Sequence, residues 1–341
     1  MRTAWAMVLV TVVAVLGASV SEAQTPGDVF RKVTPSVVVI RAKGTELTAG
    51  GQTRFLETGS GVLISSDGKI MTAAHVVHSM SDIDVEFLGG DTVRAKVIAS
   101  ELGADLSLLQ IERVPPGARV AKMADSDTVR VGDPIYIVGA PYGLSYSLSA
   151  GLISARWAPN TVYKTMPLAE FFQTDATINT GNSGGPMFNS AGDVIGIVSH
   201  NISKSGGSEG LGFVVTMKTA QDLLLKKRSF WGGVDGQFLT DELADLLNVP
   251  NNMTGFLVKS VAKDSPGERA GLRGGTKLVT LDGQQMVLGG DILLTVEGVP
   301  VSSTTNMANI RDHLAGLKSG APIKTTILRA GKVLELTGTA P

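Results

Sequence analysis

The sequence predicts a mainly β protein built from two small antiparallel barrels and a third, smaller α+β unit. Glycine is abundant, with 41 in 341 residues, and long helical periodicities are scarce, which favours strands joined by many turns. Short runs rich in β-branched residues recur in two sets of about six, separated at Val114-Pro115-Pro116-Gly117. The length fits two domains with additional segments.

The first set of runs predicts one six-stranded barrel. Residues 24–35 before it are interpreted as a linker that enters the first strand. Ser66-Asp67-Gly68 is a hairpin-turn signal between the second and third strands. The predicted strands are Ser36–Arg41, Gly61–Ser65, Ile70–Ala74, Ile83–Phe87, Val93–Ala99 and Leu106–Ile111.

The second set predicts another barrel of the same size. A helix over Met217–Arg228 closes this part, with cations near its end where they complement the helix dipole. The expected first domain therefore covers residues 24–228. The predicted strands are Pro134–Val138, Tyr146–Ala155, Phe171–Thr174, Pro186–Phe188, Val194–Ser199 and Gly212–Val215.

The third unit, residues 229–341, mixes helices and strands. Thr240 is expected to cap a short helix with two acidic residues in its first turn. Ser303–Leu317 has apolar residues at helical spacing. The predicted strands are Gly255–Val261, Asp291–Val296, Ile323–Leu328 and Lys332–Leu336.

Residues 1–23 are typical of a targeting segment. Arg2 precedes an apolar run over Ala4–Ala18, and Ser21-Glu22-Ala23 offers a small-x-small cleavage site before Gln24. We therefore expect a cleaved signal peptide and an exported, periplasmic protein. Because no charge occurs between Arg2 and Glu22, a retained membrane anchor is the alternative.

Composition excludes several function classes. Basic and acidic residues balance at 30 against 31 with no basic stripe, so we expect no nucleic-acid partner. The absence of cysteine excludes disulfides, zinc–thiolate sites and a catalytic thiol. His75 and His78 have no third ligand at a suggestive spacing, so no metal and no cofactor are expected. His78 is interpreted as a partly exposed side chain.

Three motifs together predict nucleophilic catalysis. Gly181-Asn182-Ser183-Gly184-Gly185-Pro186 places Ser183 among small residues, where backbone N–H groups can face a substrate oxygen. A serine hydroxyl needs a neighbouring base, and the base needs a group that fixes its tautomer. His75 in Thr72-Ala73-Ala74-His75 and Asp105 in Ala104-Asp105-Leu106 supply these roles. The order His, Asp, Ser is that of chymotrypsin-type proteases.

Two alternatives for the serine motif are weaker. Gly-x-Ser-x-Gly also marks the nucleophile elbow of α/β-hydrolases, but that fold needs its acid and histidine after the serine. Only His200 and His313 follow Ser183, and strands and helices do not alternate around it. An ordinary glycine-rich turn would explain the serine alone, but not together with His75 and Asp105.

Beyond these motifs, the chain resembles the HtrA/Deg serine proteases over nearly all of its length after the leader. The resemblance extends over Val29–Val38, Gly59–Ile64, Thr72–Val77, Ala104–Leu109 and Gln173–Thr180, with Thr180 where proline is usual. It implies a chymotrypsin-like double β-barrel that cleaves misfolded or unfolded polypeptides, with an oxyanion hole formed by the N–H groups of Gly181 and Ser183. It also implies a homotrimer contact at Phe30, for which core packing is the alternative.

The third unit resembles the PDZ domain that follows such proteases. Trp231-Gly232-Gly233-Val234 is similar to the loop that binds a peptide C-terminal carboxylate, with Gly232 where a larger apolar residue is usual. Ser265-Pro266-Gly267 and Ala270-Gly271-Leu272 match a turn of these domains. Thr276–Gly289 is an insertion, expected to form a surface hairpin. C-terminal peptides are the expected ligands.

The expected substrate pocket is uncharged. Thr177, six residues before the serine, lies at the base of the primary pocket in trypsin-like proteases. Ile178 and Val198 are expected to form apolar walls, and Asn201 to narrow the entrance. Cleavage is therefore expected after small or medium aliphatic residues. The competing hypothesis is a binding or chaperone protein in which the PDZ unit does the main work and the protease fold is latent.

Overall fold

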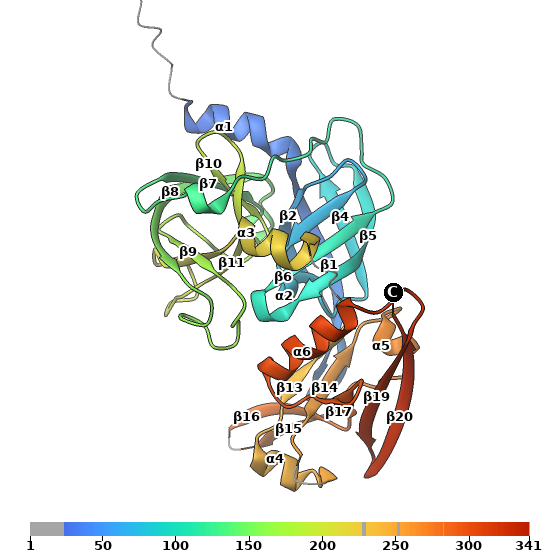
Figure 1. Cartoon of the computed structure of the whole chain (residues 1–341). Helices are drawn as coiled ribbons and strands as arrows, with labels where there is room; N and C mark the ends of the chain where they lie inside the picture. Colours follow the sequence, from blue (N-terminus) through green and yellow to red (C-terminus); the bar gives the residue numbers. More distant parts are fainter. Residues whose placement is uncertain (1–23, 227–229, 251–252, 282, 341) are drawn as a thin grey trace, which may run out of the picture.

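The protein is described here by a computed structural model, which covers residues 24–226, 230–250, 253–281 and 283–340. The predicted leader, residues 1–23, lies outside them. Two barrels pack side by side, and the third unit lies against one end of the pair (Figure 1). Across the described ranges, no helix is both long enough and apolar enough to cross a membrane.

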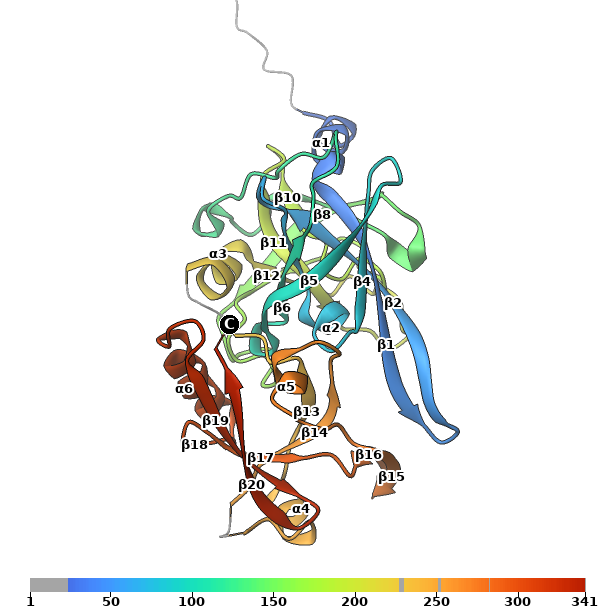
Figure 2. The ribbon, with the colours of Figure 1, turned by 90° about the vertical axis from the view of Figure 1, so that its right-hand side faces the viewer.

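The first barrel is closed and antiparallel, in the strand order β1-β2-β3-β6-β5-β4. The short helix α2 (Ala74–Val77) follows β3, and a 3-10 turn, η2 (Leu102–Ala104), joins β5 to β6. The β1–β2 hairpin extends well beyond the barrel (Figure 2). The strands are β1 (Val37–Thr48), β2 (Gly51–Leu63), β3 (Lys69–Thr72), β4 (Asp82–Phe87), β5 (Thr92–Glu101) and β6 (Leu106–Ile111).

The second barrel is also closed, in the order β10-β11-β12-β9-β8-β7. Helix α3 (Met217–Gln221) continues into a π-helical turn (Asp222–Lys226), where the sequence predicts one helix. The strands are β7 (Pro134–Gly139), β8 (Ser147–Trp157), β9 (Phe171–Thr174), β10 (Pro186–Asn189), β11 (Val194–Asn201) and β12 (Gly212–Thr216). All twelve predicted barrel strands are present, with somewhat different ends.

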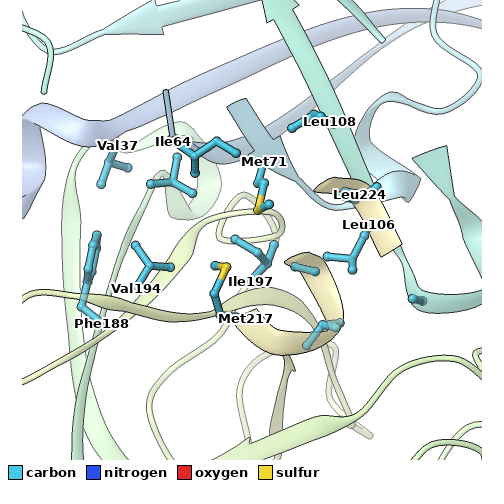
Figure 3. Close-up of a cluster of buried hydrophobic side chains, with 14 of the residues drawn as sticks. Val37, Ile64, Met71, Leu106, Leu108, Phe188, Val194, Ile197, Met217 and Leu224 are labelled. Atoms are coloured by element: carbon cyan, nitrogen blue, oxygen red, sulfur yellow. The ribbon is translucent and has the colours of Figure 1, made fainter. Parts of the chain in front are cut away.

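One apolar cluster joins the two barrels (Figure 3). Met71 and Leu106 contribute from the first barrel, and Phe188 and Ile197 from the second, all fully buried. Met217 of α3 lies in the same cluster. Because interiors are close-packed, this shared core fixes the position of one barrel on the other.

The expected linker at residues 24–35 was wrong, because helix α1 (Pro26–Val33) occupies it. Thr25 and Asp28 form a capping box, in which each side chain accepts from the other residue's backbone N–H. Pro26 stands at the start of the helix, where its missing N–H is not needed. Val29 and Val33 bury one face on the core between the barrels.

The third unit is a sheet in the order β13-β14-β17-β19-β20, with β18 paired to β17. The insertion forms a separate hairpin as predicted, although its turn residue Asp282 lies outside the described part. Its elements are β13 (Val234–Phe238), α4 (Asp241–Leu246), β14 (Phe256–Val261), α5 (Pro266–Arg269), β15 (Lys277–Leu281), β16 (Gln284–Leu288), β17 (Ile292–Val296), β18 (Val299–Pro300), α6 (Thr304–Ala315), β19 (Pro322–Arg329) and β20 (Lys332–Thr339).

Candidate active site

His75 and Asp105 form a hydrogen-bonded pair at the edge of the first barrel. His75 lies in α2 directly after β3, and Asp105 follows η2 with a left-handed backbone (φ 53°). The His75 backbone N–H and Nδ1 lie 3.0 and 2.9 Å from Asp105 Oδ1. The carboxylate therefore fixes the proton on Nδ1 and leaves Nε2 free to act as a base.

The environment shifts both pKa values in the directions that catalysis needs. Burial alone would raise the pKa of Asp105, but the hydrogen bonds and charge of His75, with the Ser199 hydroxyl, hold it below its usual range. Burial alone would lower the pKa of His75, yet Asp105, with a smaller contribution from Glu57, raises it above the ordinary value. Asp105 thus stays ionised and stabilises a proton on His75.

Ser183 lies in the loop before β10, and Ser199 connects it to this pair, since Ser199 contacts both Ser183 and Asp105. Its hydroxyl donates to the backbone carbonyl of Ser199 at 3.2 Å. Among the described residues it makes no hydrogen bond with His75. Catalytic hydrogen bonds are often long or poorly aligned without substrate, so the absence of this bond does not exclude Ser183 as the nucleophile.

The loop that carries Ser183 leaves two amide groups available. The N–H groups of Gly181 and Ser183 have no hydrogen-bond partner among the described residues, whereas Asn182 N–H donates to Asn179 O at 3.0 Å. Gly181 has φ 102°, and a Cβ there would lie 2.1 Å from the Ala140 carbonyl oxygen. Glycine is therefore required for a loop that presents these two donors.

Two residues that the sequence analysis missed hold this arrangement. Ser60 is fully buried, and its hydroxyl donates to Gly181 O at 2.7 Å while it accepts from Ala140 N at 3.0 Å. The Ser199 hydroxyl donates to Asp105 Oδ2. The only sequence signal for Ser60 is its place in Gly59-Ser60-Gly61, and Ser199 reads as an ordinary strand residue.

The expected pocket residues have different surroundings. Ile178 and Val198 lie in the buried core of the second barrel. Thr177 is exposed, and its carbonyl accepts from Asn182 Nδ2 at 3.4 Å. Asn201 Nδ2 donates to Ile178 O at 3.0 Å and to Gly207 O at 3.3 Å. Asn201 is thus bonded to the loop before β12, and the cleavage preference stays a prediction.

The third unit has a groove beside its candidate carboxylate loop. The amides of Gly232 and Gly233 have no partner among the described residues, and Gly233 has φ 70°. A cavity of about 360 Å³ opens next to them, between β13 and α6. Its opposite wall comes from the first barrel and the loop before β9, through Leu102 and Leu168.

The interpretation of His78 as partly exposed was wrong. His78 is buried where the third unit meets the first barrel, and burial lowers its pKa. Its Nδ1 lies 2.7 Å from Ser100 Oγ, and its Nε2 lies 3.0 Å from Val234 O. Trp231 Nε1 donates to His78 O at 2.8 Å. Contacts between the two units, invisible in the sequence, decide this burial.

Comparisons with known proteins agree with the barrels and the candidate site. The family model described as a trypsin-like peptidase domain matches residues 59–197. A protein named as a probable periplasmic serine endoprotease, DegP-like, from Pseudomonas fulva (strain 12-X) is 34% identical over 272 residues, which are 77% of this chain and 55% of that protein. A protein of the same name from Hahella chejuensis (strain KCTC 2396) is 35% identical over 243 residues, which are 69% of this chain and 50% of that protein.

Solved structures give the same result. The structure titled "HtrA-type protease AlgW with decapeptide" matches with a TM-score of 0.54 and 27% identity, over 92% of this chain and 98% of that one. The structure titled "HtrA-type protease AlgW with tripeptide" matches with a TM-score of 0.53 and 28% identity, over 92% of this chain and 96% of that one. The chain spans about half the length of the curated relatives it matches.

Proposed function

The chain belongs to the HtrA/Deg family of trypsin-like serine proteases, and from that premise we propose that it is an exported serine endoprotease. Misfolded or unfolded polypeptides are the proposed substrates, and the proposed cleavage needs no cofactor. The observation that carries the proposal is the His75–Asp105 pair facing a loop that presents Ser183 with two free amide groups.

The proposed reaction follows from this geometry. The Ser183 hydroxyl leaves the Ser199 carbonyl, turns to His75 Nε2 and attacks the substrate carbonyl as His75 takes its proton. Asp105 stabilises the resulting imidazolium. The N–H groups of Gly181 and Ser183 receive the oxyanion, and His75 then returns the proton to the leaving amine. Asp105, held by three hydrogen-bond donors, needs no reorganisation during these steps.

We also propose that residues 24–228 form the protease domain and residues 229–341 a PDZ domain. A peptide would add to β13 as a further strand and lie between β13 and α6. Its carboxylate would accept from the N–H groups of Gly232 and Gly233. The titles of the AlgW structures, which name a decapeptide and a tripeptide, support peptides as the class of ligand.

Location and assembly remain proposals. The names of the relatives support a periplasmic protein, with residues 1–23 removed as a signal peptide rather than kept as an anchor. A homotrimer through Phe30 is proposed from the family resemblance. Phe30 also packs against the core between the barrels, which is the competing explanation.

Casein cleavage by the purified protein, beside Ser183→Ala, tests the proposed function. Removal of the nucleophile of such a triad costs on the order of 10⁶ in kcat, so the variant is expected to be inactive with an unchanged melting temperature. Cleavage by the variant would refute the role of Ser183. Inactivity of both proteins on casein and on unfolded polypeptides would instead favour the binding or chaperone hypothesis.

A further inference from the structure

A second histidine lies directly behind the candidate catalytic pair, in a box of aromatic rings. The His200 ring is stacked on Phe213, with centroids 5.5 Å apart and planes 13° from parallel. Tyr163 and Phe171 meet it edge-on, at centroid distances of 4.1 and 5.6 Å. These three rings belong to the core shared by the two barrels. Their contacts fix the orientation of the His200 imidazole.

A β-bulge places this ring next to Ser199. In β11, Val198 pairs with Val214 and His200 with Phe213, so Ser199 is an extra residue in the ladder. Adjacent side chains of a regular strand point to opposite faces. The bulge brings two adjacent side chains together, so that His200 Nδ1 lies 2.9 Å from Ser199 Oγ.

The directions of these hydrogen bonds follow from proton counting. The Ser199 hydroxyl has one proton, and that proton is donated to Asp105 Oδ2. Ser199 Oγ must therefore accept from His200, which requires the proton on His200 Nδ1. Burial lowers the pKa of His200 to about 4, so the ring is neutral near pH 7 and Nε2 carries no proton.

The other ring nitrogen supports the neutral form. His200 Nε2 is buried without a hydrogen-bond partner among the described residues. A second proton there would place an unpartnered charge among aromatic rings, which is strongly unfavourable. A charge on His75 would repel that charge and lower the pKa of His200 further. The negative charge of Asp105 acts in the opposite direction, but the pKa of His200 stays low.

We propose that His200 is a positioning residue of the triad, which holds the Ser199 hydroxyl on Asp105 and thereby orients the Asp105–His75 pair. This inference rests on the proposed function. A serine hydroxyl rotates among several staggered positions unless its neighbours select one. The Nδ1–H of His200 occupies a lone pair of Ser199 Oγ and leaves the hydroxyl proton directed at the carboxylate.

A matched pair of variants tests the hydrogen bond separately from the packing. His200→Leu removes the donor, whereas His200→Asn branches at Cγ as leucine does and can place an amide N–H near the position of Nδ1. The two variants lose the same half of the ring and differ in the hydrogen-bond donor. We expect His200→Leu to lower kcat about three- to tenfold with KM unchanged, the usual range for one lost hydrogen bond. His200→Asn should recover most of that loss. Tyr163→Phe, which changes the same box without touching Ser199, should match the wild type.

The pH profile provides a readout that loss of packing alone would not move. Without the Ser199 donor, Asp105 becomes more basic and stabilises the charged form of His75 more strongly. The acid limb of kcat/KM should therefore move to higher pH in His200→Leu and stay in place in His200→Asn. Equal losses in both variants with an unchanged profile, or wild-type kcat in His200→Leu, would overturn the proposal.

Nuclear magnetic resonance tests the same inference without any substrate. The whole chain has four histidines, so their ring signals can be assigned by substitution. We expect the Nδ1–H tautomer for His200, and a His75 Nδ1 proton signal that weakens in His200→Leu. The Nε2–H tautomer for His200 would refute the proposal. Absence of proteolysis in the wild type with these signals present would refute the proposed function alone.

Discussion

Substitution of Gly181 by alanine tests whether the loop before Ser183 presents an oxyanion hole. A Cβ at this position would lie 2.1 Å from Ala140 O and 3.1 Å from Tyr142 N, both backbone atoms. Real side chains do not approach backbone so closely, so the loop has to move. Gly181 carries one of the two free amides, and Ser183 carries both the other amide and the nucleophile.

The size of the effect can be separated into two parts. A positive φ for alanine costs about 1–2 kcal/mol of stability, which shifts the melting temperature of a domain of this size by only a few degrees. Displacement of one oxyanion donor costs about 10²–10³ in kcat. We therefore expect Gly181→Ala to lose at least about 10² in kcat while it still unfolds cooperatively.

Gly117→Ala is the matched control for this variant. Gly117 has φ 86°, close to the 102° of Gly181, but a Cβ there would meet no atom within 4 Å. It should lose only the stability that the positive φ costs, without the additional cost of the clash at Gly181, and keep wild-type kinetics. Both variants are measured with a fluorogenic peptide and by thermal unfolding. A kcat for Gly181→Ala within a few-fold of the wild type would refute the oxyanion assignment.

Other predictions test the remaining parts of the site. Asp105→Asn should keep the fold and lose about 10⁴ in kcat, because the wrong His75 tautomer is favoured; near-normal turnover would refute the orienting role of Asp105. Because Asp105 raises the pKa of His75, and the neutral ring is the active base, kcat/KM should fall as pH decreases through a value above the 6.5 of free histidine; a midpoint below 6.5 would contradict this. A C-terminally amidated peptide should bind the proposed PDZ domain more weakly than its free acid in calorimetric titration; equal affinity would exclude carboxylate recognition by Gly232 and Gly233. Mass spectrometry of casein fragments should show cuts mainly after Val, Ala, Ile or Leu, and a majority after Lys or Arg would overturn the uncharged pocket around Thr177.

The barrel strands were predictable because each is specified locally, by β-branched residues between turn signals. Helix α1 was equally local, since Thr25 and Asp28 are spaced as a capping box, but the segment is too short to show a convincing helical period. Its helix is stabilised by burial of Val29 and Val33 against both barrels. Tertiary packing of this kind is not visible in a single segment.

The candidate catalytic pair and the candidate serine loop could be located from the sequence for a different reason: their residue types are chemically demanding and occur in the required order. The supporting contacts could not be. Ser199 reaches Asp105 from 94 positions away, and Ser60 reaches Gly181 from 121 positions away. The bulge that turns Ser199 and His200 to one side depends on how β11 pairs with β12, and strand register is a property of the pair.

The third unit contacts the first barrel next to both members of the candidate catalytic pair. His78, bonded to Val234 O and to the Trp231 indole, follows α2, which carries His75 three residues earlier. Glu101 pairs with Arg311 of α6 at 3.1 Å, and each side chain is only 17% exposed.

Glu101 also accepts from Gly103 N at 3.2 Å, and so caps the turn that presents Asp105. A partly buried ion pair is screened less by salt than a surface pair. Glu101 thus belongs both to the wall of the groove between β13 and α6 and to the turn before Asp105. Loss of the Glu101 carboxylate would leave Asp312 as the remaining ion-pair partner of Arg311 and would leave this turn uncapped. The turn that presents Asp105 is therefore linked, through Glu101, to Arg311 of the third unit.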